Sequence, residues 1–451
     1  ASRGLGDVYK RQNIRHDGSS RFAKKHRWGT FPSFSAGWVL SEENFMKNLN
    51  WDWLSFLKIR ATWGALGNER IGDFPYMSTI AFGNTIFYQN NGIYFDQTAS
   101  QQKYAIENVT WEKTESTDIG LDISFLNNRL RVNGDYYWKN TKDMLLAMAI
   151  PDFLGFSDPD VNAGKMSTKG YELNVSWNDH IGDFSYGIAI NFSDFTSKMG
   201  DLQGTQFLGD KVKMEGSEFN EWYGYVSDGL FLTEEDLKNS PKINDKNTQL
   251  GDIKYKDISG PDGVPDGKIS PEYDRVLLGS SLPHFLYGGN INLGYKNFDL
   301  SLAFQGVGKQ NARLAREMVE PFRNNYGNFP AIIDGNYWSP YNTDEQNAVA
   351  KYPRLTHVNK SSNYAMSDYW LFNGGYFRLK NITLGYTFPK EWMNAIGIKG
   401  ARIYASASDL FCLSKYPKGW DPEMGVSEYP ITTSILSVSY THLTLPTKLE
   451  V

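Results

Sequence analysis

The chain has no apolar run long enough to form a membrane-spanning helix. Charged residues make up 22% of its 451 residues, and the longest apolar runs, such as residues 144–150, are only a few residues long. A helix needs about 20 consecutive apolar residues to cross a bilayer, so a helical membrane protein is excluded. A β-barrel is not excluded, because lipid-facing and lumen-facing residues alternate along its strands and their hydropathies average out.

Cysteine, strong charge and catalytic motifs are also scarce. Cys412 is the only cysteine, so no internal disulfide can form. The net charge is −5 and Lys and Arg form no run, which excludes an electrostatic nucleic-acid interface. Neither HExxH nor a GxSxG nucleophile elbow occurs. We therefore expect a non-enzyme that needs no cofactor for chemistry.

What the chain has in abundance is aromatic residues and period-two alternation. It contains 27 Tyr, 27 Phe and 13 Trp, as expected for aromatic girdles at two membrane interfaces, although a large soluble sandwich or propeller would also explain them. In residues 118–125, Ile119, Leu121 and Ile123 alternate with polar residues, which predicts a strand with one apolar face. The same pattern predicts strands at residues 130–139, 171–177, 184–192, 285–295 and 298–305, and further strands are expected at 32–40, 54–66, 92–96, 376–388 and 402–413.

Strand length and loop length both favour a membrane barrel. Soluble strands usually have about five or six residues, whereas several of these reach the roughly nine to eleven that cross a bilayer. Tight turns at 127–128 and 296–297 contrast with long Gly- and Pro-rich segments at 198–282 and 309–373. Short helices are expected after Thr233 and over residues 311–320. The predicted fold is all-β, a large antiparallel transmembrane β-barrel with long extracellular loops.

Several stretches, read in order, resemble the SusC/RagA-like TonB-dependent transporters of Bacteroidetes. They are RHDGSSRF (15–22), RWGTFPSFSAGW (27–38), LKIRATWGALGN (57–68), WEKTESTDIGLD (111–122), GDIKYKDISG (251–260), SLPHFLYGGNINLGYKNFDLSLAFQG (281–306) and GGYFRLKNITLGYTFP (374–389). The resemblance implies that the chain is the C-terminal portion of an outer-membrane barrel of about 22 strands with a plug, which imports oligosaccharides or peptides.

The resemblance also implies partners and boundaries. The expected partners are a SusD-like surface lipoprotein acting as a lid, the TonB–ExbB–ExbD complex and outer-membrane lipid, with no nucleic acid. TonB would be contacted through an N-terminal part that this chain lacks, together with the plug and the early strands. Residues 1–12 and 437–451 resemble translated sequencing-adapter sequence and fit poorly with their neighbours. We therefore assign the partial barrel to residues 13–436.

Two groups of loop residues are candidates for binding. Aromatic side chains that can stack on a sugar or line a peptide path are Trp222, Tyr223, Tyr225, Trp338, Tyr369 and Trp370, with Tyr341 and Trp420 as further loop aromatics. Interface girdles and loop packing explain such residues more often than binding does. Oxygen ligands for a possible Ca²⁺ site are Asp257, Asp262, Asp266 and Asp274. If Asp262 and Asp266 fill the first and fifth positions of a DxNxDG-type loop, Val264 occupies the third, and the alternative is a turn-rich surface loop.

Other functional classes stay open at this stage. A passive porin or a TonB-dependent receptor for metal chelates would share the barrel and differ in the plug or the cargo. A secreted β-rich glycan-binding protein or hydrolase would have sandwich-length strands and dissolve without detergent.

Overall fold

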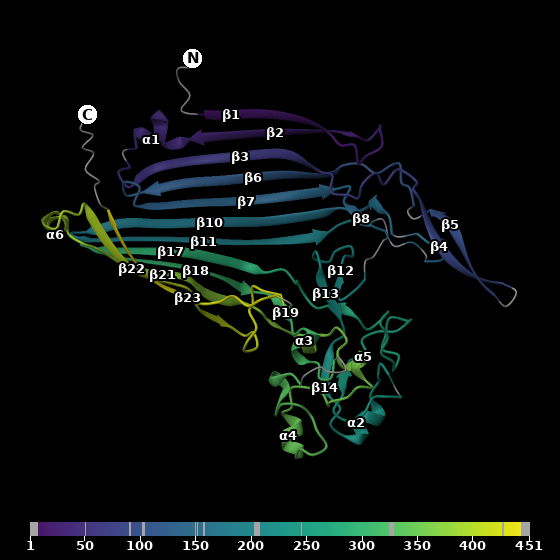
Figure 1. Cartoon of the computed structure of the whole chain (residues 1–451). Helices are drawn as coiled ribbons and strands as arrows, with labels where there is room; N and C mark the ends of the chain where they lie inside the picture. The colour runs from purple at the N-terminus through teal and green to yellow at the C-terminus, as the bar shows by residue number, and fades with distance from the viewer. Residues whose placement is uncertain are drawn as a thin grey trace, which may run out of the picture. The chain divides into compact units, whose positions relative to one another are not determined.

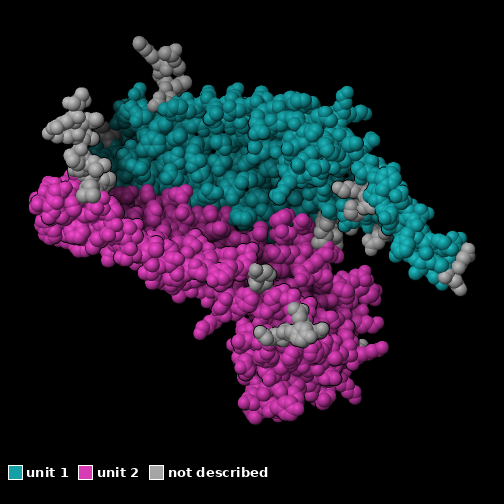
Figure 2. All heavy atoms as spheres, in the orientation of Figure 1, with its two compact units in different colours: residues 1–173, 195–207, 214–218 teal, residues 174–194, 208–213, 219–451 magenta. Residues whose placement is uncertain are grey.

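The computed structural model is mostly antiparallel β-structure, and twelve of its strands belong to one large sheet. It describes residues 8–49, 51–89, 92–101, 104–148, 150, 152–156, 158–202, 208–244, 246–323, 329–425 and 428–442. The chain divides into two compact units: unit 1 comprises residues 1–173, 195–207 and 214–218, and unit 2 comprises 174–194, 208–213 and 219–451 (Figure 2). Within the described residues, no helix is long and apolar enough to cross a membrane. The predicted all-β fold is confirmed.

Unit 1 contains long strands that pair with one another in chain order (Figure 1). They are β1 (Val8–Gly18), β2 (Trp28–Val39), β3 (Leu54–Asn68), β6 (Glu112–Phe125), β7 (Leu130–Lys142) and the first half of β10 (Met166–Ile181). Its shorter elements are η1 (Leu40–Glu42), α1 (Asn44–Lys47), the hairpin β4 (Ile80–Gln89) and β5 (Gly92–Gln101), β8 (Leu145–Ala147), η2 (Asp152–Leu154) and β9 (Asp160–Asn162).

The pairing register in unit 1 sorts apolar and polar residues onto opposite faces of the sheet. One row places Ile59 beside Leu121, and these apolar residues are 41% and 40% exposed. On the opposite face Arg60 lies 2.6 Å from Asp135 and 3.2 Å from Asp122. Successive side chains of a strand point to opposite faces, so the predicted alternation is realised. One face is suited to lipid and the other to water.

Unit 2 repeats this plan with the second half of β10, with β11 (Phe184–Met199) up to residue 194, and with β17 (His284–Tyr295), β18 (Phe298–Lys309), β21 (Tyr376–Thr387), β22 (Gly400–Ser414) and β23 (Ser434–His442). Its small elements are β12 (Lys211–Val212), β13 (Glu221–Gly224), β14 (Ser227–Leu230), α2 (Glu234–Asn239), β15 (Ile253–Tyr255), β16 (Val276–Leu277), β19 (Asn311–Arg313), α3 (Arg316–Val319), η3 (Ala331–Ile333), α4 (Asp344–Ala348), α5 (Lys360–Asn363), η4 (Asp368–Trp370), β20 (Leu371–Asn373) and α6 (Lys390–Ala395). Leu300 pairs with Leu384 on the apolar face, and Ser301 with Thr383 on the polar face.

Short turns and long connections lie at opposite ends of the strands within each unit. β6 and β7 are joined through Asn127 and Asn128, whose φ values are 56° and 65°, a left-handed conformation that Asn tolerates better than most residues. β17 and β18 are joined through Lys296 and Asn297. At the other ends, residues 200–283 follow β11 and residues 310–375 follow β18. The predicted plan of tight turns and long loops is confirmed.

The helix predicted over residues 311–320 is mostly wrong. Residues 311–313 form β19, which pairs with β20 about sixty residues later through Asn311 and Asn373, and only α3 is helical. Long-range strand pairing and the burial of Ala312 override the local helical spacing. The helix predicted after Thr233 is present, and the Thr233 side chain accepts a hydrogen bond from the backbone N–H of Asp236.

The two long connections of unit 2 fold together into what we call the loop lobe, residues 219–283 and 310–375. Its hydrophobic core draws on both connections and consists of Tyr225, Leu230, Ile253, Tyr255, Ile269, Met318, Val319, Ile333, Tyr364 and Trp370. The segments are therefore not independent surface loops, because each buries its apolar residues against the other.

Strand pairing crosses both predicted sequence boundaries. β1 pairs regularly with β2 from Val8 onward, and β23 pairs with β22 as far as His442. Because strand pairing uses main-chain groups that every non-proline residue has, it does not show where these residues come from. The foreign origin of residues 1–12 and 437–451 stays a prediction, and residues 1–7 and 443–451 lie outside the described part of the chain.

Candidate functional site

Two of the predicted aromatic contacts, Trp222 and Tyr223, lie in β13 and carry cations over their rings. The Nζ atom of Lys211 lies 4.6 Å from the centre of the Trp222 ring, and the guanidinium of Arg275 lies 4.5 Å from the centre of the Tyr223 ring. The Trp222 indole N–H donates to the backbone carbonyl of Asn311. Both rings are half-buried and held in place, and their contact with a transported molecule stays a prediction.

Three other predicted contacts have clear packing partners. Tyr225 and Trp370 are 7% and 2% exposed in the core of the loop lobe, and the Trp370 indole N–H donates to the carbonyl of Asn363 at 2.9 Å. The Tyr369 hydroxyl donates to the carbonyl of Lys351 at 2.8 Å, and burial raises the pKa of Tyr369 above its ordinary value. These side chains stabilise the lobe, and a direct role in binding stays a prediction for them.

Trp338, the remaining predicted aromatic, lines a cavity of about 720 Å³ in the loop lobe. The volume falls within the usual range of small-molecule sites, roughly 300–1,000 Å³. One wall is a turn, residues 337–341, and the other walls come from α2, from the turn before β15 and from residues 354–355. The lining residues are Glu234, Leu237, Gln249, Leu250, Tyr337, Trp338, Ser339, Pro340, Tyr341, Arg354 and Leu355.

The turn that carries the aromatic residues is fixed by two asparagines. The Asn347 side chain accepts from the N–H of Ser339 at 3.0 Å and donates to the carbonyl of the same residue at 2.9 Å. The Asn342 side chain donates to the carbonyl of Tyr337 at 3.0 Å. α4 follows at once with a capping box between Thr343 and Gln346. The turn is thus held by side chains on both sides.

Trp338 packs on Gly251, the residue before the central aspartate of the lobe. Gly251 has a φ of +83°, and a Cβ atom there would lie 2.3 Å from the indole ring. Only glycine adopts this conformation without cost and also lets a ring lie directly on the backbone. The position of the Trp338 ring therefore depends on the absence of a side chain at residue 251.

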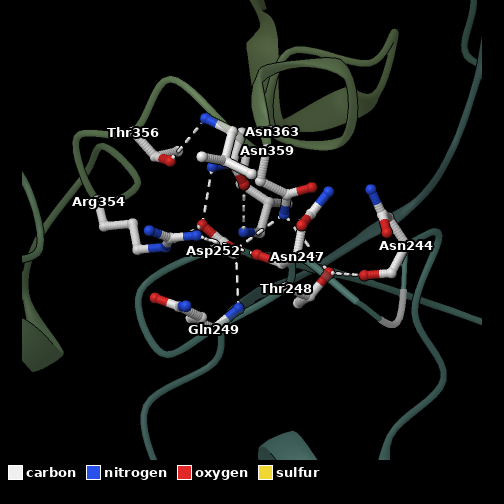
Figure 3. A network of polar contacts seen from close by, with 11 residues as sticks. Asn244, Asn247, Thr248, Gln249, Asp252, Arg354, Thr356, Asn359 and Asn363 are labelled. Carbon is white, nitrogen blue, oxygen red and sulfur yellow. Dashed lines mark hydrogen bonds and ion pairs between the residues drawn. The ribbon is translucent and has the colours of Figure 1, made fainter.

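A polar network centred on Asp252 includes Gln249 and Arg354, two of the residues that line the cavity (Figure 3). Asp252 has no exposed surface and accepts five hydrogen bonds: two from Arg354 at 2.7 and 3.2 Å, one each from the amides of Asn359 and Asn363 at 2.8 and 2.9 Å, and one from the backbone N–H of Gln249 at 2.9 Å. The side-chain oxygen of Asn363 accepts a hydrogen bond from the N–H of Ile253. The network joins the two chain segments that make the lobe.

The sequence analysis did not identify Glu234, Gln249 and Arg354 as site residues. Each is a common surface residue type. Glu234 and Gln249 lie about one hundred positions before Trp338, and Arg354 follows it outside any helix or strand, so no local periodicity connects the three with Trp338. The one local hint in the sequence is the Leu-Gly-Asp run at residues 250–252, where an acidic residue stands next to an apolar residue and a glycine. The structure shows that this acid is buried.

In the Asp-rich loop, the carboxylate of Asp274 is completely buried and organises the backbone. One oxygen accepts the N–H groups of Ile258 and Ser259 at 2.7 and 3.2 Å, and the other accepts the N–H of Ser270 at 2.7 Å. Both oxygens are therefore already engaged. A buried carboxylate that closes a loop in this way acts as part of the fold.

The other predicted calcium ligands do not converge. The Asp257 carboxylate accepts the N–H of Gly267 at 2.6 Å, Asp266 accepts the N–H of Lys268 at 3.0 Å, and Asp262 and Asp266 are exposed. Within the described part of the chain, no group of three or more His, Cys, Asp or Glu residues is placed to hold a metal ion. These residues do not fit a preformed calcium site, and calcium binding stays a prediction.

Comparison with known proteins gives matches over nearly the whole chain. The family model described as TonB dependent receptor-like, beta-barrel, matches residues 12–410. The TonB-dependent receptor SusC of Bacteroides thetaiotaomicron is 32% identical over 426 residues, which cover 91% of this chain and 39% of SusC. The TonB-dependent receptor P3 of Formosa agariphila is 30% identical over 433 residues, covering 91% of this chain and 40% of P3. The chain thus spans about 40% of the length of these relatives.

Solved structures show the same fold. The structure of the RagAB peptide transporter superposes with a TM-score of 0.75 at 23% identity, covering 96% of this chain and 46% of that chain. The RagAB peptide importer in its open-open state gives a TM-score of 0.74 at 21% identity. At these identities the likeness concerns the fold alone, and it agrees with the strand order and the two-faced strands described above.

Proposed function

Because this chain belongs to the TonB-dependent receptor-like β-barrel family and is homologous to SusC, we propose that the protein imports an oligosaccharide or a peptide across the outer membrane, driven by TonB. Its relatives are named TonB-dependent receptors, which supports an outer-membrane transporter or receptor over an enzyme and over a secreted glycan-binding protein. The observation that carries the proposal is the similarity to SusC over nine-tenths of the chain.

The proposed partners follow from the same relationship. A surface lipoprotein of the SusD-like kind would cover the extracellular side, where we expect the long connections of the loop lobe to lie. The TonB–ExbB–ExbD complex would supply the energy for import. Lipid would contact the rows of exposed apolar side chains such as Ile59, Leu121 and Leu384.

The test is uptake of labelled oligosaccharides and peptides by cells that carry or lack this gene, in backgrounds with and without TonB. We expect uptake that needs both the gene and TonB, together with co-purification of a surface lipoprotein from crosslinked membranes. Uptake that needs the gene but persists without TonB would instead identify a passive porin. Loss of chelated-metal uptake alone would identify a metal-chelate receptor.

Calcium binding by the Asp-rich loop is a separate proposal and requires the loop to rearrange, because Asp274 is already engaged by backbone N–H groups. Titration of chelator-treated protein with CaCl₂ in a calorimeter tests it. If the loop binds calcium, the Asp262→Asn and Asp266→Asn double variant abolishes the heat of binding, whereas Asp299→Asn on β18 leaves it unchanged. Equal heats in all three proteins reject the proposal.

A further inference from the structure

Residues 415–425, which we call the strap, follow β22 and contact both the loop lobe and the sheet of unit 2. We propose that the strap is a latch. Its carboxylates Asp421 and Glu423 fix the loop lobe to the polar face of the sheet, and their release frees the lobe to move. The latch is built entirely from residues of unit 2.

On the lobe side, the strap is attached through aromatic rings. Tyr416 packs edge-on against Phe372 of β20, with the ring centres 4.9 Å apart, and a Cβ atom at Gly374 would lie only 3.1 Å from the Tyr416 ring. Trp420 packs against the hydrophobic core of the lobe. Because separation would expose apolar surface on both partners, we expect the strap and the lobe to move together.

On the sheet side, the strap is attached through charge. The Arg378 side chain in β21 is only 3% exposed. It donates two hydrogen bonds to Asp421, both at 2.6 Å, and its Nε atom lies 2.6 Å from Glu423. The side-chain amide of Gln305, the partner of Arg378 on β18, donates to Glu423 at 3.0 Å. Gln305 follows Ser301 by four residues and therefore belongs to the polar face. Hydrogen bonds between charged groups are the stronger ones, so this end is held as long as the charges stay paired.

A third carboxylate, Asp409 of β22, competes with the strap for the same cations. It lies 2.7 Å from the Nζ atom of Lys380 and 3.7 Å from Arg378, and Lys380 also lies 3.7 Å from Glu423. The cluster thus holds three carboxylates and two cations, which leaves one negative charge among largely buried groups. Because a buried charge without a full counter-charge is costly, release of a strap carboxylate to water lowers that cost and offsets part of the lost pairing.

The backbone is irregular at the same place. The register of β21 shifts at Lys380 against both neighbouring strands, and Asp409 has a φ of 50°, a left-handed conformation that costs energy for a residue other than glycine. Bulges of this kind interrupt the strand ladder and redirect side chains, and they are frequent beside functional sites. The sheet end of the latch therefore lies where the ladder is weakest and the backbone is strained.

The first test is hydrogen–deuterium exchange of the strap, read by mass spectrometry on the protein in detergent micelles. The reporting amide is the N–H of Trp420, which donates to the carbonyl of Pro417 at 3.0 Å. The double variant Asp421→Asn with Glu423→Gln keeps the side-chain shapes and removes the charges. We expect about tenfold faster exchange or more, because a hydrogen bond to a charged group contributes at least about that factor. Asp409→Asn removes the competing charge and should slow the exchange, and asparagine tolerates the left-handed backbone.

A second measurement follows the lobe itself. Spin labels are attached through keto amino acids at the exposed positions Val349 in the lobe and Leu384 on the sheet, so that Cys412 stays unaltered. The distribution of distances between the labels should gain a second population in the strap double variant and should not in Asp409→Asn. The matched control is Asp299→Asn, because Asp299 forms its ion pair with Arg402 on the same sheet, at 2.6 Å, and not with the strap.

The opposite responses of the two kinds of variant distinguish a latch from a cluster that only stabilises the fold. Faster strap exchange in Asp409→Asn as well as in the strap double variant overturns the proposal. Unchanged exchange in the double variant overturns it too, as does faster exchange with an unchanged distance distribution. Neither measurement involves uptake, so the latch stands or fails separately from the proposed import function.

Discussion

Replacing Asp252 by alanine should loosen the loop lobe while leaving the sheet paired. The carboxylate is completely buried and Arg354 is 16% exposed in its side chain, so the substitution leaves a largely buried guanidinium and two asparagine amides without their acceptor. Removal of one partner of a buried ion pair costs about 3–5 kcal/mol. We expect the lower end, because Arg354 also donates to the carbonyl of Asn247 at 3.1 Å and keeps that bond.

Hydrogen–deuterium exchange read by mass spectrometry measures this effect where it occurs. A loss of about 3 kcal/mol raises the exchange rate of amides that open with the lobe roughly 150-fold. The backbone N–H of Ile253, which donates to the Asn363 side chain at 3.0 Å, should respond strongly. Amides in the ladder between β17 and β18 should exchange as before, because they open independently of the lobe.

The matched control is Asp228→Ala in the same lobe. Asp228 pairs with Lys254 at 2.9 Å, but its side chain is 49% exposed, and surface ion pairs contribute about 0–1 kcal/mol. If Asp252→Ala and Asp228→Ala change the exchange of Ile253 equally, the buried carboxylate does not hold the two segments together and the reasoning fails.

Three further substitutions test other parts of the lobe. Gly251→Ala should destabilise the lobe by at least about 1 kcal/mol and shift the fluorescence of the displaced Trp338; an unchanged emission spectrum contradicts the packing. Burial alone would raise the pKa of Glu320, but Arg316 and Lys360 lower it below the ordinary value. The contribution of Glu320 to the stability of the lobe is therefore present at neutral pH and is lost as the pH falls through the lowered pKa. In the unaltered protein, the protection of lobe amides from hydrogen exchange should therefore fall as the pH drops below about 4.3. Glu320→Gln should show a smaller fall, and an equal fall in both proteins contradicts this. Thr343→Ala should cost about 1 kcal/mol at α4, seen as faster exchange of the Gln346 amide.

Much of the barrel wall was predictable from the sequence because its information is local. Alternation around Ile119 and Leu121 predicts a strand with two different faces, and the asparagine pair at 127–128 predicts the turn, without knowledge of any distant residue. The same reasoning predicted a helix over residues 311–320, and this prediction was mostly wrong because residues 311–313 pair with residues 371–373. Local spacing cannot include a partner sixty positions away.

The candidate site was only partly predictable for the same reason. Trp338 was identified by residue type, but the cavity around it requires Gln249 and Arg354 to meet across about one hundred residues. Trp370 was identified by the same criterion and is buried in the core. An aromatic residue in a loop can thus belong either to a core or to a binding surface. The sequence does not distinguish these cases, because the outcome depends on how the two long connections fold against each other.

The shared core and the Asp252 network also bear on how the loop lobe could be exchanged between related proteins. Gln249 and Asp252 belong to one connection, and Arg354, Asn359 and Asn363 belong to the other. A graft of either connection from a relative would leave the aspartate or its donors unmatched, whereas a graft of both would carry a complete lobe. The two connections therefore form a single exchangeable module, and changes in one should be inherited together with changes in the other.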